Sequence, residues 1–155
     1  MSVPRKIILV GLSGAGKSTA GLTAARMLQA RARTEDPALW WDFEDIDREI
    51  ERRTQRTVAE IFARQGEAAF RKLEVAVSAE YFARQNLILS TGGGWVHHEE
   101  TVRQMREGAV MLYLRVSPAV AAARLAGSPE LRPLLEGPDP TARLEELLAR
   151  REALY

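Results

Sequence analysis

The sequence predicts a three-layer α/β domain with a central parallel sheet, and three observations support this. Apolar runs alternate with helix-forming segments along the chain, which is typical of parallel sheets. The runs are continuously apolar, as expected of strands that are covered on both faces. The length of 155 residues suits one domain with a real core, so residues 1–155 are expected to form a single unit.

The secondary-structure elements follow from these runs in order. Of the four or five strands expected in such a sheet, four can be placed, at 6–10, 39–43, 87–91 and 109–116. Helical patterns predict helices at 17–30, 58–64, 66–84, 99–107, 118–125 and 140–155. The last helix has a good start signal, because Asp139 suits the N-cap and Pro140 the first helical position.

Composition limits the classes of function. The net charge of +1 provides no basic field for nucleic acid, and the absence of cysteine excludes disulfides and thiolate chemistry. The sequence shows no apolar run of membrane-spanning length and no signal-peptide pattern. We therefore expect a cytoplasmic enzyme with neither a nucleic-acid nor a membrane partner.

A phosphate-binding loop is predicted directly after the first strand. Residues 11–19 read Gly-Leu-Ser-Gly-Ala-Gly-Lys-Ser-Thr and fit the pattern G-x-x-x-x-G-K-[ST] between a strand and a helix. Glycines let backbone N–H groups approach phosphate oxygens, and the helix directs its positive end at them. The alternative, a glycine-rich turn that carries Lys-Ser by chance, does not explain this context. We expect Lys17 to reach the β- and γ-phosphates of a nucleoside triphosphate and Ser18 to ligate Mg²⁺.

An acidic cluster follows the second predicted strand. Asp45 and Asp47 lie at the carboxyl end of that strand, where an open α/β sheet binds its ligands. Residues two apart in extended chain point to the same side, so one carboxylate is expected to hold Mg²⁺ through water while the other accepts a proton. A solvated acidic loop that caps a helix is the alternative.

The rest of the chain argues against two large classes of phosphate-loop protein. A GTPase normally carries Asn-Lys-x-Asp, but the only asparagine, Asn86, is followed by Leu87. Motor and transporter ATPases usually carry acidic residues at the end of a later strand, and the runs 87–91 and 109–116 contain none.

Two further clusters suggest an acceptor site. Glu67, Arg71 and Glu74 share one helix face; they could be a surface ion pair, but the planar fork of Arg71 also suits a carboxylate ligand. The run Gly92-Gly93-Gly94 after a strand predicts close backbone approach to a ligand, with a flexible turn as the alternative.

The segment 126–138 is rich in glycine and proline and has little to bury. It is either an ordinary connecting loop or a mobile lid that carries Arg132, and the lid is favoured in a nucleotide-binding protein.

These motifs, taken in order, resemble the shikimate kinase family. The resemblance covers nearly the whole chain, through the phosphate loop, residues 43–51, 61–62, 66–67, 70–74 and 92–94, Arg132-Pro133-Leu134-Leu135, and Arg150-Arg151. Each motif is weak alone, whereas the ordered set is specific. It implies transfer of the γ-phosphate of ATP to the 3-hydroxyl of shikimate by a monomeric enzyme with Mg²⁺ as cofactor.

The resemblance also implies a role for each matching residue. Asp47 orients and deprotonates the hydroxyl, and Mg²⁺ is held by Ser18, with Asp45 through water. Lys17 and Arg132 stabilise charge on the phosphates. The implied ATP-binding residues are Gly14, Ala15, Gly16, Lys17, Ser18, Thr19 and Arg132, and the implied shikimate-binding residues are Asp47, Arg71, Gly92, Gly93, Gly94 and Arg151.

The phosphate loop is also compatible with two alternative functions. One is a kinase for another small acceptor such as gluconate or a nucleotide, although a carboxylate clamp of Arg71 and Arg151 argues against a nucleobase. The other is a non-catalytic, ligand-sensing relative, which would be expected to lose Lys17, Asp47 or Arg132, and all three are present.

The chain departs from the family pattern in several places. The spacing from Lys17 to Asp45 is longer than usual, with the extra residues expected within 30–40. Trp95 stands where a small or aliphatic residue is usual and is expected to line the pocket, whereas His97 and His98 are expected to be exposed. Relative to the family, the chain is expected to lack a fifth strand and a final helix after Tyr155, part of which packs on adenine.

Overall fold

The computed structural model describes residues 5–35, 40–128, 133–135 and 137–155. Within these residues the sheet has four parallel strands in the order β2-β3-β1-β4. Their bounds are β1 Lys6–Val10, β2 Asp42–Asp45, β3 Leu87–Ser90 and β4 Val110–Tyr113. The central position of β1 sends the loop that follows it to the middle of the sheet's carboxyl edge, which is where ligands bind in open α/β sheets.

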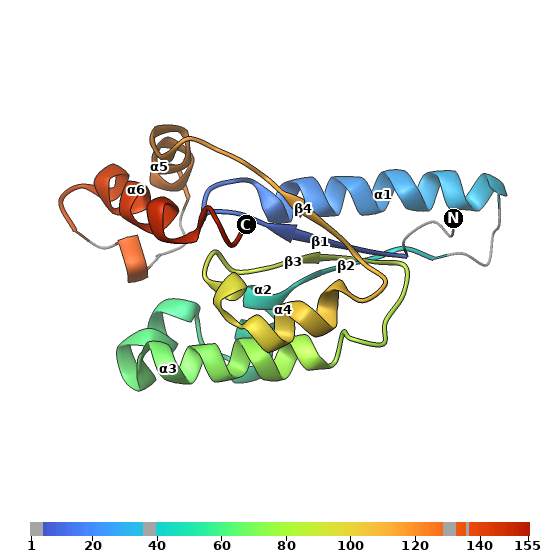
Figure 1. Cartoon of the computed structure of the whole chain (residues 1–155), viewed down its shortest axis with the longest axis horizontal. Coiled ribbons are helices and arrows are strands. Elements are labelled where there is room, and N and C mark those ends of the chain that lie inside the picture. Colours follow the sequence, from blue (N-terminus) through green and yellow to red (C-terminus); the bar gives the residue numbers. More distant parts are fainter. Residues whose placement is uncertain (1–4, 36–39, 129–132, 136) are drawn as a thin grey trace.

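Helices cover both faces of the sheet (Figure 1). Helix α1 (Lys17–Glu35) lies on one face, and α2 (Ile46–Thr54), α3 (Val58–Ala79) and α4 (Glu99–Arg106) lie on the other. Helices α5 (Pro118–Ala126) and α6 (Pro140–Arg151) pack together beyond the carboxyl ends of the strands. Two short 3₁₀ helices, η1 (Trp95–His97) and η2 (Pro133–Leu135), complete the described elements. The predicted three-layer α/β fold is confirmed.

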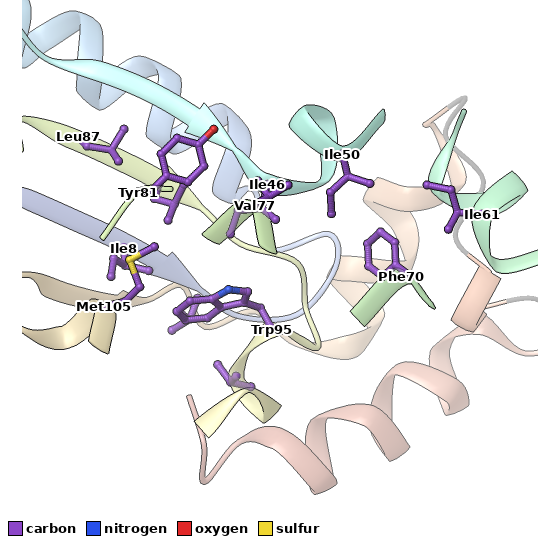
Figure 2. Packing of buried hydrophobic residues seen from close by; sticks show 13 residues of the cluster. Ile8, Ile46, Ile50, Ile61, Phe70, Val77, Tyr81, Leu87, Trp95 and Met105 are labelled. Carbon is purple, nitrogen blue, oxygen red and sulfur yellow. The ribbon is translucent and has the colours of Figure 1, made fainter. Parts of the chain in front are cut away.

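The two faces of the sheet have separate cores because successive strand residues point to opposite sides. Ile8 and Val10 of β1 join a large cluster with residues of α2, α3 and α4, which includes Trp95 and Phe70 (Figure 2). Leu9, the residue between them, packs instead with residues of α1 in a smaller cluster. A third cluster joins the phosphate loop to α5 and α6. None of the described helices combines the length and apolar content needed to span a bilayer.

Strand β2 begins three residues later and ends two residues later than the predicted range of 39–43. The backbone N–H of Trp41 donates to Gln29 Oε1 of α1 at 2.8 Å, so Trp41 is tied to the helix and not to the strand ladder. The strand itself pairs Asp42 to Asp45 with residues of β3. An edge strand can accept acidic residues: Arg84 binds Asp42 at 2.6 Å and Glu44 at 3.0 Å.

Helix α2 was not predicted. Its start is set by Asp45, whose side chain accepts a hydrogen bond from the backbone N–H of Arg48, and its buried residues Ile46 and Ile50 face the core. The break predicted between two helices at 64–66 is present as Gly66, which has a φ of 82° inside α3. Helix α1 runs past residue 30 to Glu35 and thus takes up part of the extra length, whereas α6 ends at Arg151, earlier than predicted.

Candidate active site

Two adjoining cavities lie at the carboxyl ends of the strands. The larger, of about 400 Å³, is lined by the phosphate loop, Asp45, Arg124 and the first turn of α2. The smaller is lined by Arg71, Glu74, Arg151 and η2. Asp47, Gly92 and Gly93 line both cavities. A group bound in one cavity would therefore face a group bound in the other across Asp47.

The phosphate loop has the backbone that its sequence predicts. Gly14 and Gly16 have φ values of 80° and 88°, in the left-handed region that favours glycine. A Cβ on Gly14 would lie 2.7 Å from the carbonyl oxygen of Ala121, so the loop also packs closely on α5. The ammonium of Lys17 donates to the carbonyl oxygens of Gly11 and Leu12, each at 2.8 Å. The side chain of Lys17 thus folds back on the first residues of the phosphate loop.

Ser18 and Asp45 come together beside this loop. The Ser18 hydroxyl donates to Asp45 Oδ2 at 2.5 Å, and Asp45 Oδ1 accepts from the backbone N–H of Arg48 at 3.3 Å. A hydroxyl and one carboxylate are a donor set that Mg²⁺ uses when phosphates and water supply its other ligands. Among the described residues, no cluster of three or more His, Cys, Asp or Glu suited to a metal occurs.

Asp45 and Asp47 do share a cavity, but not for the reason inferred from the sequence. They do not both lie in extended chain: Asp45 is the last residue of β2 and the N-cap of α2, while Asp47 lies in the first turn of that helix. The strand-to-helix turn, and not strand alternation, places both residues on the lining of the larger cavity. This corrects the geometry and leaves the two residues together.

Arg71 on α3 is held by two carboxylates. Its Nη1 donates to Glu74 Oε2 at 2.6 Å, and its Nε and Nη2 donate to Glu67 Oε1 at 3.1 and 2.7 Å. Burial alone would lower the pKa of Arg71, but Glu74 and Glu67 raise it above its usual value. The guanidinium lies directly against Gly94, where a side chain would collide with it. Arg71 is therefore a fixed cation on the wall of the smaller cavity.

The glycines after β3 make room for these groups. A Cβ on Gly92 would lie 2.6 Å from Glu74 Oε1 and 3.0 Å from Asp47 Oδ1. A Cβ on Gly93 would lie 3.2 Å from the backbone N of Ser13 in the phosphate loop. The groups that approach these glycines closely are the protein's own side chains and backbone, and their approach to a ligand stays a prediction.

Arg151 reaches the smaller cavity from α6. It is buried, and its Nε has no hydrogen-bond partner among the described residues. A buried guanidinium N–H without a partner is costly unless a ligand supplies one. Tyr155, near the end of the chain, donates its hydroxyl to the carbonyl oxygen of Gly93 at 2.5 Å and stacks on Tyr113.

Arg132 lies outside the described residues, as does part of the predicted lid. In the described part, Leu134 and Leu135 pack against the cluster of α5 and α6, so the expectation that this segment has little to bury is wrong there. Sequence reasoning missed Arg124, whose Nη1 donates to the carbonyl oxygen of Gly14 at 3.2 Å. No local pattern marks that arginine, because α5 is brought to the loop only by the fold.

Two expectations next to the triple glycine are corrected. Trp95 does not line either cavity: it is fully buried in the core, and its indole N–H donates to Ser78 Oγ at 2.9 Å. His97 is exposed as expected, but His98 is mostly buried and its Nε2 lies 3.1 Å from Glu74 Oε2.

A parallel α/β sheet with a phosphate loop after its central strand, and a cation-lined cavity joined to it by a carboxylate, defines the class of phosphate-loop small-molecule kinases. The family model described as shikimate kinase matches residues 13–155, and the chain belongs to that family.

Relatives and solved structures agree with this assignment. The chain is 39% identical over 149 residues to a shikimate kinase of Burkholderia pseudomallei, covering 96% of this chain and 74% of that protein. It is 38% identical to a shikimate kinase of Rhodococcus erythropolis, with 97% and 81% covered. The structure of shikimate kinase from Acinetobacter baumannii in complex with shikimate is 34% identical, with a TM-score of 0.85 over 97% of this chain and 78% of that one.

A gluconokinase from Sinorhizobium meliloti has a TM-score of 0.52 at 16% identity, over 96% of this chain and 75% of that one. That likeness shows the shared fold alone.

Proposed function

We propose that this protein transfers the γ-phosphate of ATP to the 3-hydroxyl of shikimate. The observation that carries the proposal is the sharing of Asp47 and the Gly92-Gly93 backbone by the two cavities. A triphosphate in the larger cavity and a hydroxy acid in the smaller one would meet at that carboxylate. Phosphoryl transfer needs mainly positioning and charge stabilisation, which this arrangement can supply.

On the nucleotide side, the loop backbone from Gly14 to Thr19 would bind the phosphates. Lys17 would exchange its two carbonyl partners for β- and γ-phosphate oxygens, which are better acceptors for a cation. Ser18 would hold Mg²⁺, with Asp45 through water, and the ion would neutralise phosphate charge. Arg132 would add a further positive charge from the lid.

On the acceptor side, Arg71 and Arg151 would bind the carboxylate of shikimate. Arg71 presents a guanidinium already oriented by Glu67 and Glu74, and Arg151 has a buried N–H in need of an acceptor. The backbone at 92–94 would define the floor beneath the acceptor. Asp47 would then accept the proton of the 3-hydroxyl as the hydroxyl oxygen attacks the γ-phosphorus, while the bond from that phosphorus to the β–γ bridging oxygen breaks and ADP leaves.

Assays of turnover distinguish this proposal from its alternatives. Purified protein is supplied with ATP and Mg²⁺ and with shikimate, gluconate or no acceptor, and ADP release is measured. We expect release with shikimate that greatly exceeds the other two reactions and that stops when Mg²⁺ is chelated. ADP release with gluconate but not with shikimate would favour a kinase for another small hydroxy acid. Shikimate binding without any turnover would favour a ligand-sensing module. The single domain over 1–155, the monomer and the cytoplasmic location stay predictions.

A further inference from the structure

His98 is held against a buried carboxylate that the acceptor site uses. Its side chain is 13% exposed, and its Nε2 lies 3.1 Å from Glu74 Oε2. Glu74 itself is completely buried, and the same Oε2 accepts from Arg71 Nη1 at 2.6 Å. The carboxylate oxygen that orients Arg71 is therefore shared between Arg71 and His98.

A second contact fixes the segment that carries His98. Trp95, three residues earlier, donates its indole N–H to Ser78 Oγ at 2.9 Å, and Ser78 Oγ donates to the backbone carbonyl of Glu74 at 2.6 Å. Glu74 and Ser78 are four residues apart and lie on one face of α3. The segment 95–98 thus contacts this face of α3 at two points, through the indole of Trp95 and the imidazole of His98. These two contacts fix the position of His98 relative to Glu74.

Glu74 depends on these donors because it is buried. Burying a carboxylate is costly unless hydrogen-bond donors compensate it. Arg71 provides one donor, but it also binds Glu67, so its charge is divided between two carboxylates. The other oxygen of Glu74, Oε1, has no hydrogen-bond partner among the described residues. The Nε2 of His98 is the second polar contact of this carboxylate, and since an ionised carboxylate only accepts hydrogen bonds, a hydrogen bond here requires the proton on Nε2.

We propose that His98 is a positioning residue for the acceptor: its Nε2–H fixes Glu74 Oε2, which in turn holds the Arg71 guanidinium in the orientation that receives the acceptor carboxylate. The inference rests on the proposed function, since it assigns Arg71 to shikimate. Loss of His98 would let the Glu74 carboxylate rotate and the guanidinium of Arg71 follow it, while the nucleotide side would stay intact.

The kinetic test compares His98→Ala and His98→Gln with the wild type. A glutamine amide can place an N–H close to the position of the imidazole Nε2, whereas alanine has no donor. We expect H98A to raise KM for shikimate by about three- to tenfold, the value of one hydrogen bond. KM for ATP should change less than twofold, and H98Q should restore most of the loss. His97→Ala is the matched control, because His97 is the exposed neighbour. An H98A enzyme with wild-type KM for shikimate, or an H98Q enzyme as impaired as H98A, would overturn the inference.

A second measurement does not depend on turnover. The chain has only two histidines, so His97→Ala leaves His98 as the only imidazole to be observed by ¹⁵N NMR. We expect the neutral ring of His98 to carry its proton on Nε2 and to lose this preference in Glu74→Gln. A proton on Nδ1 in the otherwise wild-type site would overturn the inference whether or not shikimate is a substrate. Absence of shikimate turnover by the wild type would instead count against the proposed function.

Discussion

The nucleotide side and the acceptor side of this site are built in different ways. The nucleotide side is built around one stretch of chain, residues 11–19, whose side chains Lys17 and Ser18 line a cavity that Asp45 and Arg124 complete from other elements. The acceptor side is assembled from α2, α3, the glycines after β3 and α6, and it uses ion-paired side chains. The first depends on local backbone conformation, whereas the second depends on how distant elements pack.

This difference predicts different sensitivity to substitution. Most phosphate contacts would come from backbone N–H groups, which no side-chain replacement removes. The acceptor contacts of Asp47, Arg71 and Arg151 would each come from one side chain, whose position depends on the packing around it. Variants on the nucleotide side should therefore change the kinetic constants for ATP, and variants on the acceptor side should change those for shikimate.

Asp47, which lines both cavities, should give the largest effect. Asp47→Asn should lower kcat by about 10²–10⁴-fold, because the amide cannot accept the proton of the acceptor hydroxyl. Affinity for ATP should stay near the wild-type value by calorimetry. Glu49→Gln is the control, since Glu49 is on the same helix but pairs with Arg52 and Arg53. Near wild-type turnover of the Asn variant would remove Asp47 from the chemistry.

Lys17 should affect the nucleotide side alone. Lys17→Met should lower kcat/KM for ATP by about 10²–10³-fold, since one preorganised charge on the phosphates is lost. Shikimate affinity, measured without nucleotide, should be unchanged. The exposed Lys72→Met serves as a control for the loss of one lysine. If the Met variant also loses shikimate affinity, the two sides are not independent.

Arg71 should affect the acceptor side alone. Arg71→Lys keeps the charge but loses the planar fork that Glu67 and Glu74 orient. KM for shikimate should rise by about 10- to 100-fold, as expected for losing a charged hydrogen bond, and KM for ATP should hardly change. Arg64→Lys, at an exposed position of α3, is the control. Equal increases in both KM values would indicate a general loss of structure.

Ser18 should give the smallest effect and a metal-specific one. Ser18→Ala removes the hydroxyl that meets Asp45, so the Mg²⁺ concentration for half-maximal rate should rise by about tenfold. Thr23→Ala controls for hydroxyl loss on α1, because the Thr23 hydroxyl donates only to the backbone carbonyl of Thr19 among the described residues. An unchanged Mg²⁺ dependence of turnover would place the metal elsewhere.

The same contrast explains which parts of the site could be predicted from the sequence. The phosphate loop was predicted residue by residue because its function depends on glycine at fixed positions in one short segment. Arg71 and the triple glycine were found by local spacing and by family resemblance. Arg124, which binds the carbonyl oxygen of Gly14, was missed because α5 lies far away in sequence.

Prediction of the fold failed where local patterns were misleading. Helix α2 was missed since its sequence, Ile-Asp-Arg-Glu-Ile-Glu-Arg-Arg-Thr, buries only Ile46 and Ile50 and is otherwise charged. The second strand was predicted at 39–43, whereas the ladder runs from Asp42 to Asp45 and is acidic except for Phe43. An edge strand beside Arg84 accepts that composition, and nothing in the local sequence indicates it.

The sequence by itself determined the alternation of strands and helices, the phosphate loop and the residue types available for catalysis, because periodicity, glycine spacing and side-chain chemistry are properties of short segments. The tertiary structure alone decided which groups meet. It placed Trp95 in the core and not in the pocket, and it brought His98 to Glu74. The reason is that these contacts join residues 17 to 24 positions apart on separate elements, and their distances are set by packing.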